Sequence, residues 1–124
     1  MRFKSRVISG TKHGSSIGHP TANLKITSAA KKALAREGVY AVRVLFKDKE
    51  YKGALFWGQR TLFSEKEPVC EVLILDFDGD LYGKIIGIDV VQYIRKTISV
   101  KNEKELKRLI KKDIEKVKHI ISKV

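Results

Sequence analysis

The apolar residues of this chain follow two different periods, and this change restricts the fold more than any other feature. Between residues 2 and 95, apolar and polar side chains alternate in short segments separated by turns. After residue 102, apolar residues recur at steps of three and four, from Leu106 to Ile121. The first pattern is typical of strands and the second of an amphipathic helix. Because no helical pattern alternates with the strands, a doubly wound α/β fold is excluded.

These patterns predict an antiparallel β-barrel or sandwich closed by one C-terminal helix. Asn102 and Glu105 have the spacing of a capping box, which places the start of that helix. The alanine-rich segment 28–38 fits either one or two helical turns capped by Ser28 or an irregular loop. We expect one domain over 1–124, with the barrel at about 1–100 and the helix at about 103–121. The predicted strands cover residues 2–9, 24–26, 38–46, 51–57, 69–77 and 81–95, the last with a bulge at Gly87.

The apolar runs and the cysteine content of the chain indicate its cellular location and exclude some structural classes. No apolar run is long enough for a signal peptide or a membrane span, so we expect a cytoplasmic protein that makes no membrane contact. We also expect a monomer. A single cysteine, Cys70, excludes an internal disulfide, and its apolar neighbours predict a small core residue.

The formal net charge of +12 permits binding to nucleic acids, anionic surfaces or phosphate-bearing small molecules. The lysines are scattered, however, and the chain has no Lys/Arg-Gly-aromatic signature of an RNA-recognition strand. Nucleic acid is therefore not expected as a partner, although a basic barrel that binds RNA or DNA remains an alternative.

One charged residue stands out in the clearest strand pattern. Glu71 shares a face with Val69, Leu73 and Leu75 by period two. A carboxylate among apolar neighbours is costly to bury unless it is paired or has a chemical role. Two interpretations remain open: this face is the floor of an active site, or it is the solvent face and the core lies opposite, under Cys70.

The segment 15–25, SSIGHPTANLK, contains the second candidate site. In an extended conformation Thr21 and Asn23 point the same way, and their hydroxyl and amide oxygens are suitable ligands for Mg²⁺. The alternative is a Thr/Asn turn that closes a surface loop. Three upstream glycines would let backbone N–H groups approach phosphates closely, and Pro20 fixes the backbone before the pair. These glycines are Gly10, Gly14 and Gly18.

The order of motifs along nearly the whole chain resembles the riboflavin kinase family, which also occurs as the C-terminal half of bacterial bifunctional FAD synthetases. The adenylyltransferase half of those proteins has no counterpart in this chain. The motifs that carry the resemblance are the glycine loop, Pro20-Thr21-Ala22-Asn23, Gly38-Val39-Tyr40-Ala41-Val42, Glu71-Val72-x-Ile74-x-Asp76-Phe77, Asp80-Leu81-Tyr82-Gly83 and Tyr93-Ile94-Arg95.

The resemblance implies a six-stranded Greek-key β-barrel with a terminal helix, and ATP-dependent phosphorylation of the riboflavin 5′-hydroxyl to give FMN. It implies that Thr21 and Asn23 bind Mg²⁺ and the ATP phosphates, and that Glu71 is the catalytic base. The glycine loop and Tyr82 would bind the nucleotide, and the segment around Arg95 would close on the flavin.

Some positions depart from the family pattern. One of the motifs of the family is the segment Asn-x-Gly-x-Arg-Pro-Thr-Phe. Here that segment begins with Phe56 in place of the asparagine and also lacks the proline. Ser15 stands where the family usually has Arg or Lys, and His19 stands where it usually has an apolar residue. After Arg95 the family commonly has a glutamate, and here Thr97 stands. These departures favour a second hypothesis, in which the domain binds a flavin or nucleotide without turnover.

Overall fold

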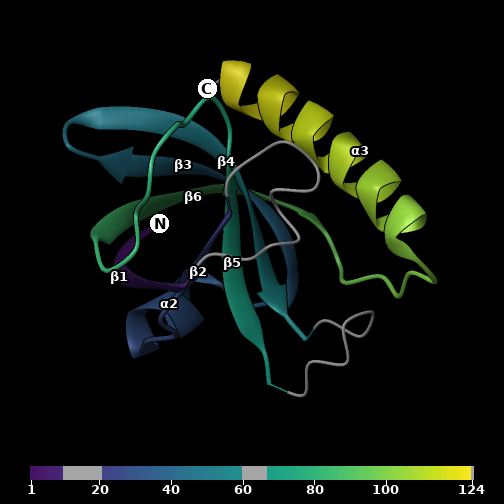
Figure 1. The fold of residues 1–124 in the computed structure, drawn as a ribbon, viewed down its shortest axis with the longest axis horizontal. Coiled ribbons are helices and arrows are strands. Elements are labelled where there is room, and N and C mark those ends of the chain that lie inside the picture. The colour runs from purple at the N-terminus through teal and green to yellow at the C-terminus, as the bar shows by residue number, and fades with distance from the viewer. Residues whose placement is uncertain (10–20, 60–66, 124) are drawn as a thin grey trace.

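The computed structural model describes residues 1–9, 21–59 and 67–123. Six antiparallel strands close into a barrel in the order β1-β2-β5-β4-β3-β6 (Figure 1). Since β6 returns to pair with β3, the order β6-β3-β4-β5 is a Greek key, which confirms the predicted fold class. The elements are β1 (Arg2–Ser9), β2 (Thr21–Leu24), α2 (Ser28–Ala33), β3 (Gly38–Phe46), β4 (Lys49–Gly58), β5 (Val69–Ile74), β6 (Ile85–Arg95) and α3 (Glu103–Ser122).

Strand β5 and the first half of β3 are buried on both sides, whereas β1 is exposed on its outer side. One set of alternating side chains fills the interior, and α3 covers part of the outer face (Figure 1). The residues of α3 that pack on the barrel include Ile114, Val117 and Ile121. In the described part of the chain, no helix is long and apolar enough to cross a membrane.

Three local details differ from the sequence-based expectations. The helix α2 forms, but Thr27 caps it instead of Ser28, because the Thr27 hydroxyl accepts from the Ala30 N–H at 3.1 Å. The short strand lies at Thr21–Leu24, earlier than predicted. Strand β6 has no bulge at Gly87, which pairs regularly with Lys4 and Leu45.

The irregularities of β6 lie instead near its C-terminal end. Its pairing with β3 shifts between Val39 and Tyr40 and again between Ala41 and Val42. Bulges of this kind bend a strand and increase its twist, which a small closed barrel requires.

The cap of α3 follows the prediction with one change of partner. The Asn102 side chain accepts from the Glu105 N–H at 2.9 Å. The Glu105 carboxylate in turn accepts from the N–H of Lys101, one residue before the cap. The terminal backbone donors of the helix are satisfied in either arrangement.

Candidate active site

Three of the predicted site residues lie together on the outer face of β2 and β5. The strands pair so that Asn23 is directly opposite Glu71, and Thr21 is opposite Leu73. The alternate residues Ala22 and Val72 belong to the barrel interior, so the side chains of Thr21, Asn23 and Glu71 point outward. Residues directly opposite in an antiparallel pair have Cβ atoms about 4.5–5.5 Å apart. The structure therefore brings an amide and a carboxylate into one cross-strand pair, with a hydroxyl two residues away.

The Asn23 side chain is held in place by β1. Its amide nitrogen donates to the Ser9 hydroxyl oxygen at 2.9 Å. This bond orients the amide, whose carbonyl oxygen is the atom suited to coordinate a cation.

Glu71 is only 6% exposed although it lies on the outer face. Leu73 and Leu75, which share its face, are buried in the cluster that packs against α3. The opposite face, with Cys70, is buried in the barrel interior. The hypothesis that Glu71 lies on a solvent face is therefore wrong, because the outer side of β5 is covered as well.

Phe56 on β4 lies on the other side of Glu71. The register of β4 and β5 places these two residues directly opposite each other. Where the family segment has an asparagine, Glu71 thus faces an aromatic ring. The departure noted in the sequence lies beside the candidate base.

The register continues this row across the barrel to Arg95. Phe56 is opposite Val39, and Val39 is opposite Arg95 at the end of β6. Neighbouring strands lie about 4.8 Å apart, so three steps separate Glu71 from Arg95 by about 14 Å along the surface.

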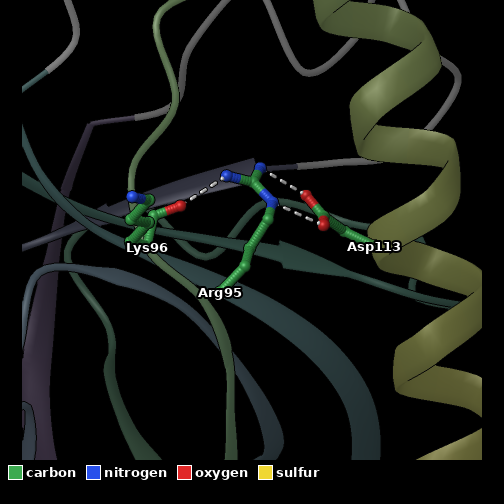
Figure 2. Close-up of polar contacts among 3 residues, drawn as sticks. All are labelled: Arg95, Lys96 and Asp113. Atoms are coloured by element: carbon green, nitrogen blue, oxygen red, sulfur yellow. Dashed lines mark hydrogen bonds and ion pairs between the residues drawn. The ribbon is translucent and has the colours of Figure 1, made fainter.

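The Arg95 guanidinium binds Asp113 of α3 (Figure 2). Its Nε donates to Asp113 Oδ1 at 2.9 Å, and Nη2 donates to Oδ2 at 2.7 Å. Nη1 donates to the Lys96 carbonyl oxygen at 3.0 Å. Such a bidentate pair is geometrically specific and fixes both side chains. Arg95 therefore joins β6 to the middle of α3. Its guanidinium is bound to the carboxylate of Asp113 in this structure.

Asp113 is a residue that the sequence-based site prediction missed. It is 3% exposed and lies among the apolar residues that α3 turns toward the barrel. The signal was present, since a carboxylate at 113 interrupts the apolar steps between Ile110 and Ile114. A charged residue on the buried stripe of a helix indicates a partner on the surface beneath it.

A small cavity of about 60 Å³ lies between Thr21 and one further predicted residue, Tyr82. Thr21 and Tyr82 both line it, together with Asp80 and Leu81 of the β5–β6 connection. Asp80 accepts the Tyr82 N–H at 2.9 Å, which fixes the turn. The Tyr82 side chain is 65% exposed at this position.

Two further expectations can be compared with the structure. Cys70 is 1% exposed, and burial raises the pKa of its thiol to about 12, so it is a protonated core residue as predicted. The candidate residues Gly10, Gly14, Gly18 and Pro20 lie outside the described residues.

The fold and this site define a class of protein. It is a small closed barrel whose outer face carries oxygen donors, and these donors are suited to bind a hard cation together with phosphate groups. The family model described as riboflavin kinase (flavokinase) matches residues 1–121. The chain belongs to the riboflavin kinase family.

Curated relatives agree with this family. The chain is 37% identical over 111 residues to the trifunctional protein RibF/MnmA of Mycoplasmoides gallisepticum, covering 90% of this chain and 17% of that protein. It is 34% identical over 118 residues to the bifunctional riboflavin kinase/FMN adenylyltransferase of Haemophilus influenzae, covering 94% of this chain and 37% of that protein. The chain thus spans less than two fifths of the length of either relative.

Solved structures share the fold. A riboflavin kinase from Trypanosoma brucei superposes with a TM-score of 0.68 at 22% identity, covering 98% of this chain and 80% of that chain. A structure from Streptococcus pneumoniae titled as a macrolide-efflux protein has a TM-score of 0.76 at 28% identity, covering 94% of this chain and 38% of that chain.

Proposed function

We propose that the chain transfers the γ-phosphate of ATP to the 5′-hydroxyl of riboflavin and so produces FMN. The observation that carries this proposal is the cross-strand pair of Asn23 and Glu71, with Thr21 beside it, in a member of the riboflavin kinase family. We expect the enzyme to act in the cytoplasm as a monomer.

Glu71 is the general base of the proposed reaction. Its carboxylate accepts a hydrogen bond from the riboflavin 5′-hydroxyl and takes the proton as the new oxygen–phosphorus bond forms. The bond from the γ-phosphorus to the bridging oxygen breaks, and ADP leaves with that electron pair. Phosphoryl transfer depends mainly on positioning and charge neutralisation, which a buried carboxylate next to fixed donors supports.

Thr21 and Asn23 fit a Mg²⁺ site. Mg²⁺ is usually held by one or two protein oxygens together with phosphate oxygens and water, and a hydroxyl and an amide oxygen supply such ligands. When bound, the ion would neutralise charge on the β- and γ-phosphates. In the described residues no group of three or more His, Cys, Asp and Glu side chains could hold a metal by itself, so substrate phosphates would complete the site.

The two substrates occupy different sides of Glu71 in this proposal. We place the nucleotide beside Thr21 and Tyr82, where the exposed tyrosine is available for stacking. We place the flavin on the Arg95 side of Glu71, as the family resemblance implies, and outside the row from Glu71 to Arg95, because Val39 in the middle of that row is buried against α3. Arg95, bound to Asp113, marks the far end of that row.

A second candidate function is binding of a flavin or nucleotide without turnover. The pairing of Phe56 with Glu71 favours it, because an aromatic ring stands where the family pattern offers an amide to the same face. An aromatic neighbour supports flavin stacking but gives the carboxylate no hydrogen bond from an amide.

One assay separates the two candidates. The protein is incubated with riboflavin, ATP and Mg²⁺, and FMN is quantified by chromatography while riboflavin binding is followed by fluorescence. Glu71→Gln should lower kcat by 10²-fold or more, the usual contribution of a general base, with little change in KM. Asn23→Ala should raise the Mg²⁺ and ATP concentrations required.

Glu50→Gln is the matched control, since Glu50 is an exposed carboxylate on β4 and should be neutral. Flavin binding without FMN in the wild type would establish the second candidate instead. A Glu71→Gln variant within threefold of the wild-type kcat would show that Glu71 is not the base.

A further inference from the structure

The outer surface of α3 is the most strongly charged surface that the proposed reaction does not use. The helix buries Ile114, Val117 and Ile121 against the barrel, so its opposite side faces away from it (Figure 1). Five exposed cations lie on that side and are named here the helix cation stripe. They are Lys104, Arg108, Lys111, Lys112 and Lys118.

The carboxylates of the helix offset only part of the charge of this stripe. Asp113 is buried and bound to Arg95, and Glu105 caps the first turn. At 100° per residue, Glu103 falls on the barrel-facing side and only Glu115 lies within the stripe. In the part of the chain that the structure describes, no ion pair joins any stripe cation to a carboxylate.

The stripe has the length and spacing of a nucleic-acid strand. From Lys104 to Lys118 the helix rises about 21 Å, at 1.5 Å per residue. Cations three and four residues apart lie about 5–6 Å from each other on one face. A strand whose bases are stacked as in a duplex carries one charge per about 3.4 Å of axis, so the stripe would span about six phosphates of a stacked single strand.

The apolar content of the helix distinguishes nucleic acid from a membrane surface. A helix that lies in a membrane interface buries an apolar face among the lipids. Here the apolar face of α3, with Ile114 and Val117, is already used by the barrel, and the stripe contains no apolar or aromatic side chain. The phosphate backbone of a nucleic acid can be bound by the cationic side chains of the stripe without any apolar contact.

We propose that the helix cation stripe binds the phosphate backbone of a nucleic acid without reading its sequence. The proposal goes beyond the kinase reaction and does not depend on it. It differs from the expectation from sequence that nucleic acid is not a partner, and the experiment below tests between the two. Scattered lysines in the sequence become one line once the helix is formed, because residues 3, 4 and 7 apart share a face.

The test uses the full chain and a fluorescein-labelled single-stranded RNA of 20 nucleotides with mixed sequence. Anisotropy titrations at 50, 100 and 200 mM NaCl give the slope of log K against log salt. Five phosphate contacts predict a slope of about −3.5, which is a loss of roughly 100-fold over this range. The triple variant K104Q/R108Q/K111Q should reduce the magnitude of the slope by about 2 and weaken binding at least tenfold at 50 mM.

A charge-matched control distinguishes this surface from net charge. The variant K4Q/K32Q/K49Q removes three exposed lysines from β1, α2 and β4 and should bind within threefold of the wild type. Equal weakening by both triple variants would overturn the proposal, and so would absence of RNA binding at 50 mM. Binding to phosphatidylserine vesicles but not to RNA would assign the stripe to membranes and also overturn it.

Folding and catalysis are followed in parallel. Both triple variants should keep the wild-type helical circular dichroism and the same rate of FMN formation, because the stripe lies outside the proposed active site. If the triple variant does not fold, the single variants Arg108→Gln and Lys111→Gln must each lower the magnitude of the slope by about 0.7. Unchanged slopes in both would refute the proposal.

Discussion

Replacing Asp113 by asparagine should destabilise the protein more than any other single change of a charged side chain outside the reaction centre. The side chains of Arg95 and Asp113 are 14% and 5% exposed, and two hydrogen bonds join them. Asparagine keeps the shape of the side chain but leaves the Arg95 cation without its counter-charge. Breaking a buried pair in this way costs about 3–5 kcal/mol of unfolding free energy. For 124 residues that corresponds to a lowering of Tm by about 12–19 °C.

The free energy of unfolding can be measured by urea titration with Trp57, the single tryptophan, as the fluorescent reporter. Trp57 packs against the barrel core, so its emission should report global unfolding. The double variant Arg95→Met/Asp113→Leu should recover most of the loss, because a well-packed apolar pair replaces both charges.

A matched control is the ion pair of Arg2 with Asp89. Its nitrogen–oxygen distance is 3.6 Å and the Arg2 side chain is 68% exposed. Exposed pairs contribute about 0–1 kcal/mol, so Arg2→Gln should change Tm by less than about 4 °C. If Asp113→Asn costs less than about 1 kcal/mol, the reasoning from burial is refuted and the pair is solvated in solution.

Three further predictions concern the backbone and the core. Lys47 and Asp48 have φ of 50° and 63° in the β3–β4 turn, so replacing them by Asn-Gly should raise the unfolding free energy by about 1 kcal/mol in urea titrations. Gly38→Ala should cost more than about 2 kcal/mol in the same titrations, because φ is 151° and the added Cβ would lie 2.2 Å from a backbone oxygen. The Cys70 thiol has a pKa of about 12 when folded against 9.0 otherwise, so above pH 9 the unfolded chain releases a proton that the folded chain keeps. Wild type should therefore lose about 1.4 kcal/mol per pH unit relative to Cys70→Ala, and a parallel pH dependence of the two proteins would contradict this.

Much of the fold could be predicted from local pattern. The alternation in 2–9 and 38–46 predicted strands that the structure confirms, because successive side chains of any strand point to opposite faces. The helix from Glu103 followed from its cap and its apolar steps. The bulge at Gly87 was wrong, since curvature is set by closure of the whole barrel and not by one glycine.

The candidate site could be predicted in part. The residue types at Thr21, Asn23 and Glu71 indicated oxygen donors and a carboxylate, and their motif order pointed to one family. Their proximity could not be read from local pattern, because it depends on the register between β2 and β5. The same register places Phe56 beside Glu71, which turns a sequence departure into a neighbour of the candidate base.

The sequence by itself determined which segments form strands and helix, because side-chain direction along the backbone is a local property. Only the tertiary structure decided what covers each face. Leu73 and Leu75 on the outer side of β5 are buried in the cluster that includes α3, and Asp113 meets Arg95 because the helix packs on β6. Burial and pairing depend on segments far apart in the chain, so the roles of these charges appear only when the barrel closes and the helix packs on it.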